Sequence, residues 1–234
     1  MRPSSKEERF KVPFCVSEIG QRIAWLIGKP ALVFFLHFRV YGKENISGLK
    51  NGFILSSNHT SEIDPLLILS SFDFFSKRLA VYFVSAPRDF YRDNLFQSIF
   101  YTEAIFRFVG AYPAIFGMKN FEKALQSHIG FLHKKRNVVI FPEGKIIRNK
   151  KQKVAKGGVV ALAKATNALV VPVAISGVSN ISFKDFLLRR RYASISFGKP
   201  IFTDELFYGY DNPSPRQYSK ISNEKIMSKI EEMF

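Results

Sequence analysis

The sequence predicts an α/β fold in which a largely parallel central sheet is flanked by helices. Three observations predict this fold. Short apolar runs bounded by turn residues alternate along the chain with segments of helical periodicity, as in repeated strand–helix–strand units. The hydrophobic share of 47% fits a packed core. The length of 234 residues favours one domain, or one domain with an N-terminal appendage.

The apolar segment near the N-terminus indicates membrane association. Residues 23–40 would be long enough to suggest a span, but Lys29 and Pro30 interrupt them. A lysine at mid-depth costs about 2.5–3.5 kcal/mol, and proline breaks the helical hydrogen-bond ladder. We therefore predict two shorter helices lying in the membrane interface, with a spanning helix and a buried core helix as alternatives. Residues 1–40 form the predicted helical membrane-association segment, and residues 41–234 form the α/β domain.

The elements of the α/β domain follow in order from the apolar runs and the helical patterns between them. Strands are expected at 53–57, 79–84, 137–141, 168–175 and 193–197. Helices are expected at 65–71, 93–109, 119–134 and 156–166, with a closing helix in 217–234. In such folds, ligands bind beyond the carboxyl ends of the strands.

Composition restricts the partners and the compartment. Cys15 is the only cysteine, which excludes an internal disulfide and a cysteine-rich zinc site and favours a reducing compartment. The formal net charge of +16 attracts polyanions: an anionic membrane face, an acidic carrier protein or nucleic acid. The 25 phenylalanines favour membrane contact, and because the chain carries no recognisable nucleic-acid-binding motif, nucleic acid is not an expected partner.

The first candidate site follows the first strand of the α/β domain. Pro65 suits the first position of a helix, so Asp64 is expected to be the N-cap residue. His59 lies five residues earlier, where the strand gives way to a loop. A tight loop before the cap brings the two side chains together, and an imidazole held by a carboxylate has a fixed tautomer and can remove a proton from an alcohol.

The second candidate site follows the strand at 137–141. Pro142, Glu143 and Gly144 place a carboxylate and a flexible turn at the same carboxyl edge. A plain turn after a buried strand is the alternative. A basic stretch that runs from Lys145 through Arg148 to Lys156 leads into a glycine pair and a helix, which is a plausible receptor for phosphate.

These motifs resemble those of the glycerolipid acyltransferases of the lysophosphatidate acyltransferase (PlsC-like) type. The form H-x4-D over 59–64 is followed by F-P-E-G at 141–144, K-G-G at 156–158 and V-P-V at 171–173. The resemblance covers about residues 40–200, and it makes the domain at 41–234 an acyltransferase domain.

The resemblance implies an enzyme of phospholipid biosynthesis with a role for each matched residue. His59 would be the general base on the acceptor hydroxyl, and Asp64 would orient it. Glu143 and Gly144, with Pro142, Lys145 and Arg148 beside them, would bind the acceptor. The acyl donor would be an acyl-CoA or acyl-carrier-protein thioester, with no metal and no other cofactor, and the protein would lie on the cytoplasmic face of the cell membrane as a peripheral or monotopic protein.

Two departures from the family pattern leave the acceptor open. Lys145-Ile146-Ile147 stands where the family commonly has Thr-Arg-Ser, and Gly110-Ala111-Tyr112-Pro113 lacks the arginine expected soon after it. Lysine supplies charge but not the planar two-pronged grip of arginine. The favoured acceptor is 1-acyl-sn-glycerol-3-phosphate, giving phosphatidate, with another lysolipid as the alternative. A serine lipase or esterase using Ser57 or Ser61 is the third reading, although the chain has no G-x-S-x-G motif.

Overall fold

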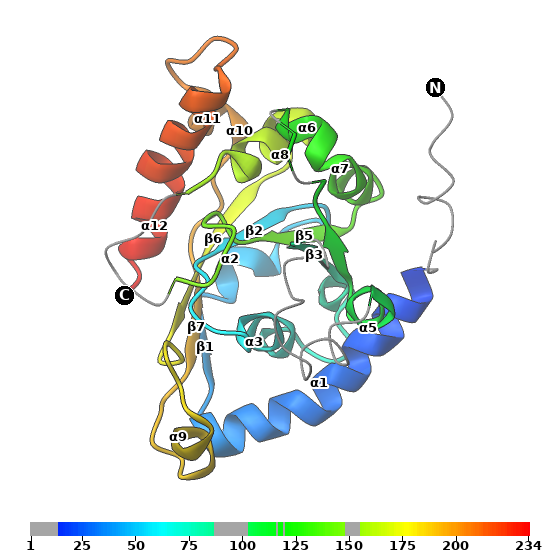
Figure 1. Cartoon of the computed structure of the whole chain (residues 1–234), viewed down its shortest axis with the longest axis vertical. Helices are drawn as coiled ribbons and strands as arrows, with labels where there is room; N and C mark the ends of the chain where they lie inside the picture. The colour runs from blue at the N-terminus through cyan, green and yellow to red at the C-terminus, as the bar shows by residue number, and fades with distance from the viewer. Residues whose placement is uncertain (1–13, 87–102, 116, 119, 148–154) are drawn as a thin grey trace.

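The computed structural model describes residues 14–86, 103–115, 117–118, 120–147 and 155–234, and these ranges form one seven-stranded sheet with helices on both faces (Figure 1). The strands are β1 (Arg39–Tyr41), β2 (Ile54–Ser57), β3 (Val81–Ser85), β4 (Ala111–Pro113), β5 (Asn137–Ile140), β6 (Val170–Ser176) and β7 (Ser194–Phe197). Their order in the sheet is β1-β7-β6-β2-β5-β3-β4. Only β6 and β7 pair antiparallel among these neighbours, so the predicted largely parallel α/β fold is confirmed.

The helices connect and cover these strands. They are α1 (Phe14–Leu36), α2 (Glu44–Ser47), α3 (Asp64–Ser71), α5 (Glu103–Phe108), α6 (Phe121–Ala124), α7 (Gln126–His133), α8 (Gly158–Thr166), α9 (Phe183–Leu187), α10 (Thr203–Phe207), α11 (Pro215–Ile221) and α12 (Ser228–Glu231). A short 3-10 helix, η1 (Lys77–Leu79), precedes β3, and a π-helical stretch, η3 (Ser222–Met227), joins α11 to α12.

Two hydrophobic cores lie on opposite faces of the sheet. On β2, Leu55 belongs to the core shared with α1 and α3, whereas its neighbour Ile54 belongs to the core shared with α7, α8 and the C-terminal helices. This division follows from the pleat, because successive side chains of a strand point to opposite faces. Both residues are fully buried, so β2 runs through the middle of the molecule and holds the loop after it rigidly.

Helix α1 is a single helix, so the predicted break at Pro30 is wrong. Pro30 removes one helical hydrogen bond, but the residues around it are held by packing. Gly28 lies against α3 so closely that a Cβ atom would come within 2.5 Å of Leu66, and Leu32 is buried in the core. The packing between α1 and α3 therefore keeps α1 helical on both sides of Pro30.

Polar side chains also tie α1 to the domain. The Gln21 side chain donates a hydrogen bond to the carbonyl of Val109 at 3.1 Å and accepts one from the amide of Val81 at 3.2 Å. The Ser17 hydroxyl donates to the carbonyl of Arg107 at 2.6 Å. Both side chains are completely buried. Pulling α1 away would leave these polar groups without their protein partners, which makes α1 part of the folded body.

Other helix boundaries differ from the sequence expectation. The predicted helix over 119–134 is divided at Leu125, because the Asn120 side chain caps α6 and the backbone leaves helical geometry at Leu125 before α7 begins. Asp64 is the first residue of α3 rather than its N-cap, a position that Ile63 takes. Residues 93–102 of the predicted helix over 93–109 lie outside the described residues, and α5 accounts for the rest.

A histidine on α7, His128, is buried in a way that shifts its pKa. His128 is fully buried, and its Nε2 lies 3.4 Å from the carbonyl oxygen of Phe83. Burial, only partly offset by backbone hydrogen bonds, lowers the pKa of His128 from 6.5 to about 4. The folded protein therefore keeps this ring neutral at a pH where the unfolded chain binds a proton.

We expect the free energy of unfolding to fall as the pH falls from about 6.5 toward 4. The unfolded state binds more protons in this window, so the contribution of His128 is present above it and is lost through it, by about 3 kcal/mol. Urea unfolding of His128→Gln across this window should show a correspondingly shallower pH dependence than the unmodified chain. His133→Gln, on the exposed side of the same helix, should not; equal slopes for all three proteins would contradict this prediction.

Candidate active site

The candidate site lies where two neighbouring parallel strands end. β2 and β5 pair in register, with Ser56 opposite Ile140. The loop after β2 carries His59, and the loop after β5 carries Pro142, Glu143 and Gly144. Because the strands are parallel and adjacent, both loops emerge at the same carboxyl edge, as the sequence predicts.

His59 and Asp64 are in direct contact. The Nδ1 atom of His59 lies 2.9 Å from Oδ2 of Asp64. The same oxygen accepts hydrogen bonds from the backbone amides of Thr60 at 2.6 Å and Ser61 at 2.9 Å. The Asp64 side chain is completely buried, and it sits at the N-terminus of α3, where the helix dipole favours negative charge. A carboxylate held in this way keeps the proton of the imidazole on Nδ1.

The ring of His59 is oriented from two further directions. It stacks on Phe141, with ring centroids 4.0 Å apart and planes inclined by 16°. Its backbone amide donates a 2.7 Å hydrogen bond to Oε2 of Glu143. The ring is 17% exposed, so it reaches the surface of the cavity described below. With Nδ1 bound to Asp64, Nε2 is the nitrogen that can take a proton from a substrate.

The start of this loop is locked to the neighbouring strand. The Asn58 side chain donates to the carbonyl of Ile175 on β6 at 2.9 Å and accepts from the amide of the same residue at 2.7 Å. Asn58 is the first residue after β2, and its side chain bonds to the β6 backbone there in place of a β2 backbone group. The residue before the histidine is therefore held by two buried hydrogen bonds, which limits the movement of His59.

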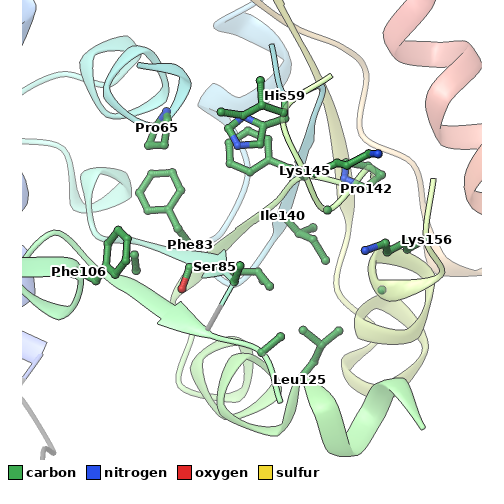
Figure 2. Close-up of a pocket in the computed structure, with 18 of the residues that line it drawn as sticks. His59, Pro65, Phe83, Ser85, Phe106, Leu125, Ile140, Pro142, Lys145 and Lys156 are labelled. Carbon is green, nitrogen blue, oxygen red and sulfur yellow. The ribbon is translucent and has the colours of Figure 1, made fainter. Parts of the chain in front are cut away.

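Gly144 and two lysines form the other side of the site. Gly144 has a φ of +65°, and a Cβ atom there would come within 2.8 Å of the Nζ atom of Lys156. The amide of Lys156 donates to the carbonyl of Pro142 at 2.7 Å, which fixes the start of the α8 region against the loop after β5. Lys145 and Lys156 both line the same cavity as His59 (Figure 2). Glycine at 144 thus leaves room for the ammonium group of Lys156.

The cavity itself is large and mostly apolar. Its volume is about 610 Å³. Figure 2 shows His59 and Lys145 at one end and Leu125 at the other, with Phe83 and Phe106 along one wall. The wall also includes Ala24 of α1. An apolar cavity with a base and a lysine at one end and a second lysine in its wall can hold an amphipathic molecule with a hydrocarbon chain and an anionic head.

The structure places the predicted site residues in three groups. His59, Pro142, Gly144 and Lys145 line the cavity. Asp64 and Glu143 lie behind it and contact His59, with Glu143 only 4% exposed. Arg148 lies outside the described residues.

Two charged side chains that line the cavity are not among the site residues predicted from the sequence. Lys156 appears in the sequence analysis as the end of the basic stretch and the start of the K-G-G motif, but it is not among the predicted acceptor-binding residues. Glu62 also lines the cavity, and its position inside the H-x4-D motif carried no separate signal.

The serine hydroxyls near His59 make their hydrogen bonds to backbone groups of the described residues. The Ser57 hydroxyl donates to the carbonyl of Asn58 at 3.1 Å, and the Ser61 hydroxyl accepts from the amide of Ile63 at 3.5 Å. Within the described part of the chain, no hydrogen bond is found between His59 and either hydroxyl. In the same ranges, no group of three or more His, Cys, Asp or Glu side chains could hold a metal ion.

Comparisons with known proteins agree with this geometry. A model of the acyltransferase family matches residues 37–176, which run from the approach to β1 through the end of β6. Among solved structures, the chain is similar to the 1-acyl-sn-glycerophosphate (LPA) acyltransferase PlsC from Thermotoga maritima, with a TM-score of 0.60 and 18% identity over 97% of this chain and 86% of the other. At that identity the likeness is one of fold. No curated protein matches the chain.

Proposed function

The chain belongs to the acyltransferase family, and we propose that it transfers a fatty acyl group from an acyl thioester to the free hydroxyl of a lysophospholipid in phospholipid biosynthesis. The favoured acceptor is 1-acyl-sn-glycerol-3-phosphate, which would become phosphatidate. The proposed donor is the acyl thioester of coenzyme A or of acyl carrier protein, and the proposed reaction uses no other cofactor. The observation that carries the proposal is the 2.9 Å contact between His59 and Asp64 at the end of an apolar cavity.

The proposed reaction uses the two nitrogens of His59 differently. Nε2 takes the proton of the acceptor hydroxyl while the hydroxyl oxygen attacks the carbonyl carbon of the thioester. Asp64, bound to Nδ1, stabilises the imidazolium that forms. When the tetrahedral intermediate collapses, the carbon–sulfur bond breaks and the imidazolium returns the proton to the leaving thiolate. The enzyme ends in its starting state, and no acyl-enzyme is formed.

The direct test offers the purified protein a panel of lysolipids with each donor type and identifies the products by mass spectrometry. We expect a diacyl product and free thiol in equal amounts, with the highest kcat/KM for lysophosphatidate. A higher kcat/KM for another lysolipid would select the alternative acceptor. Release of free fatty acid without a diacyl product would support the lipase reading and contradict the proposal.

The lysines of the cavity are the proposed contacts for an acceptor phosphate. Lys145→Ala should raise KM for a phosphorylated acceptor about tenfold and change KM for a phosphate-free acceptor little, because a hydrogen bond to a charged group contributes about 1.5–3 kcal/mol. Steady-state kinetics with both acceptors measures this. Lys229→Ala, a surface change on α12, is the matched control; equal KM effects on both acceptors would contradict the contact.

The proposed position of α1 is in the plane of the membrane interface. Cys15–Leu36 is, in the described ranges, the one helix long and apolar enough to cross a membrane by length and composition. Its buried polar contacts to Val81, Arg107 and Val109 support a helix that stays on the domain. Its exposed apolar side chains fall within one face of about 120°, counted at 100° per residue. These side chains are Ile19, Ile23, Leu26, Ile27, Val33 and Phe34. We place this face on the cytoplasmic side of the cell membrane.

A further inference from the structure

A second exposed apolar surface lies on α9 and the turn after it. Phe183 is 77% exposed, Tyr192 is 69% exposed, and Leu187 and Leu188 are each about half exposed. The helix that presents them is well formed, because Ser182 and Asp185 make a reciprocal capping box at its start. Four large apolar side chains exposed within ten residues of an ordered element are more than isolated surface residues, and they indicate a binding surface.

The same segment is strongly cationic. Lys184, Arg189, Arg190 and Arg191 lie in it against a single carboxylate, Asp185. The Ser182 hydroxyl and the nearby arginines hold the pKa of Asp185 below its ordinary value, so this carboxylate remains charged and the segment keeps a net charge of about +3 at neutral pH. Phe183, Leu187, Leu188 and Tyr192 together with Arg189, Arg190 and Arg191 are called the α9 surface below.

The α9 surface is joined to the exposed face of α1. The guanidinium carbon of Arg189 lies 4.5 Å from the centroid of the Phe34 ring, and Phe34 belongs to that exposed face. Behind this contact, Phe186 packs on Phe35 with centroids 4.8 Å apart, and Tyr192 stacks on His37 at 4.7 Å. Figure 1 shows α9 beside the C-terminal end of α1. Segments about 150 residues apart in the chain thus form one continuous surface.

We propose that the α9 surface is a second membrane contact, which binds the anionic headgroups of a lipid bilayer through Arg189, Arg190 and Arg191 and inserts its apolar side chains beside them. The proposal rests on the proposed function in taking the exposed face of α1 as the first contact. Charge complementarity selects the occupant: arginines beside exposed aromatic and leucine side chains match a negatively charged membrane interface.

A second contact changes what the first can do. A single interfacial helix defines a line on the membrane, and the protein can still rotate about that line. The α9 surface lies beside the C-terminal end of α1 and belongs to a different segment, so contact there would restrain the rotation of α1 about its own axis. Contact at both sites would therefore fix the orientation of the cavity relative to the bilayer, which one helix cannot do.

The test measures binding of the full chain to vesicles of phosphatidylcholine alone and of phosphatidylcholine mixed with phosphatidylglycerol. Arg190→Gln/Arg191→Gln should weaken partitioning onto the anionic vesicles about 30-fold at low salt and leave binding to the neutral vesicles unchanged. Phe183→Ser/Leu187→Ser should weaken binding to both kinds of vesicle. Thermal melting checks that each variant is folded.

The matched control is Lys220→Gln/Lys229→Gln, which removes the same net charge from the C-terminal helices, on the opposite face of the sheet from α1. An equal loss of anionic-vesicle binding in the control, or no loss in the arginine variant, would overturn the proposal. A dimer in buffer that Phe183→Ser/Leu187→Ser dissociates would also overturn it, in favour of a second copy as the occupant.

Acyl transfer in detergent micelles separates this proposal from the proposed function. The α9 variants should keep the unmodified rate there, because none of the changed residues lines the cavity. If the unmodified protein acylates no lysolipid, the proposed function fails while the vesicle result stands. If acyl transfer proceeds but the α9 variants bind vesicles as well as the unmodified protein does, this inference alone fails.

Discussion

His59→Ala is expected to lower the rate of acyl transfer by about 10²–10⁴-fold, the range that a positioned general base contributes. The loss should appear in kcat, because the alanine removes the proton acceptor and leaves the apolar cavity that holds the acyl chain. Release of free thiol from the acyl thioester, followed with saturating acceptor, measures it. The ring is partly exposed and stacks on one aromatic neighbour, so its removal should not unfold the chain.

His59→Gln sharpens this test. Glutamine can still donate a hydrogen bond toward Asp64 but cannot take a proton at neutral pH, so we expect a loss similar to that of the alanine variant. His133→Ala changes an exposed histidine on α7 and should leave the rate unchanged. Turnover of His59→Gln within a few-fold of the unmodified enzyme would remove His59 from the role of base.

Asp64→Asn is expected to lower kcat by about 10³–10⁴-fold, comparable to the loss when the aspartate of a serine-protease triad becomes asparagine. The amide can still accept from the Thr60 and Ser61 backbone, so the loop should persist. It carries no charge to stabilise an imidazolium. Single-turnover kinetics would report the slowed chemical step.

Asp64→Ala separates structure from chemistry at the same position. It leaves two loop amides without their acceptor, so it should also lower the free energy of unfolding by about 1–3 kcal/mol. Asp73→Asn removes the charge of a surface carboxylate paired with Lys43 and should change neither quantity. An Asp64→Asn enzyme that keeps its kcat would show that the carboxylate only holds the loop.

The buried strands could be predicted from sequence because their apolar runs are continuous and bounded by turns. β2 and β5 lie within one residue of the expected ranges. β1 and β4 were missed, since each has three residues and is a strand only through its partner, β7 and β3 respectively. The wrongly predicted break in α1 has the same cause. The effect of Pro30 is local, but the packing of α1 against α3 that overrides it is not visible in the sequence.

The site could be predicted in part. The spacing of His59 and Asp64 predicted their contact, because a tight loop before a helix leaves them few other arrangements. The acceptor contact predicted for Glu143 stays a prediction, and its observed partner is the backbone amide of His59, a hydrogen bond between segments 84 residues apart. The cavity could not be predicted from the sequence, because residues from elements far apart in the chain line it.

Ala24 of α1 belongs to the wall of the cavity, and a neighbouring face of the same helix is apolar and open to the surroundings. If that side rests among lipids, a lysolipid can pass sideways from the leaflet into the enzyme without its tail crossing water. Extraction into solvent would cost about 0.8 kcal/mol for each methylene, on the order of 10 kcal/mol for a full-length tail. A lateral route removes this penalty from the reaction, so turnover would follow the surface concentration of acceptor in the leaflet rather than its concentration in bulk solution.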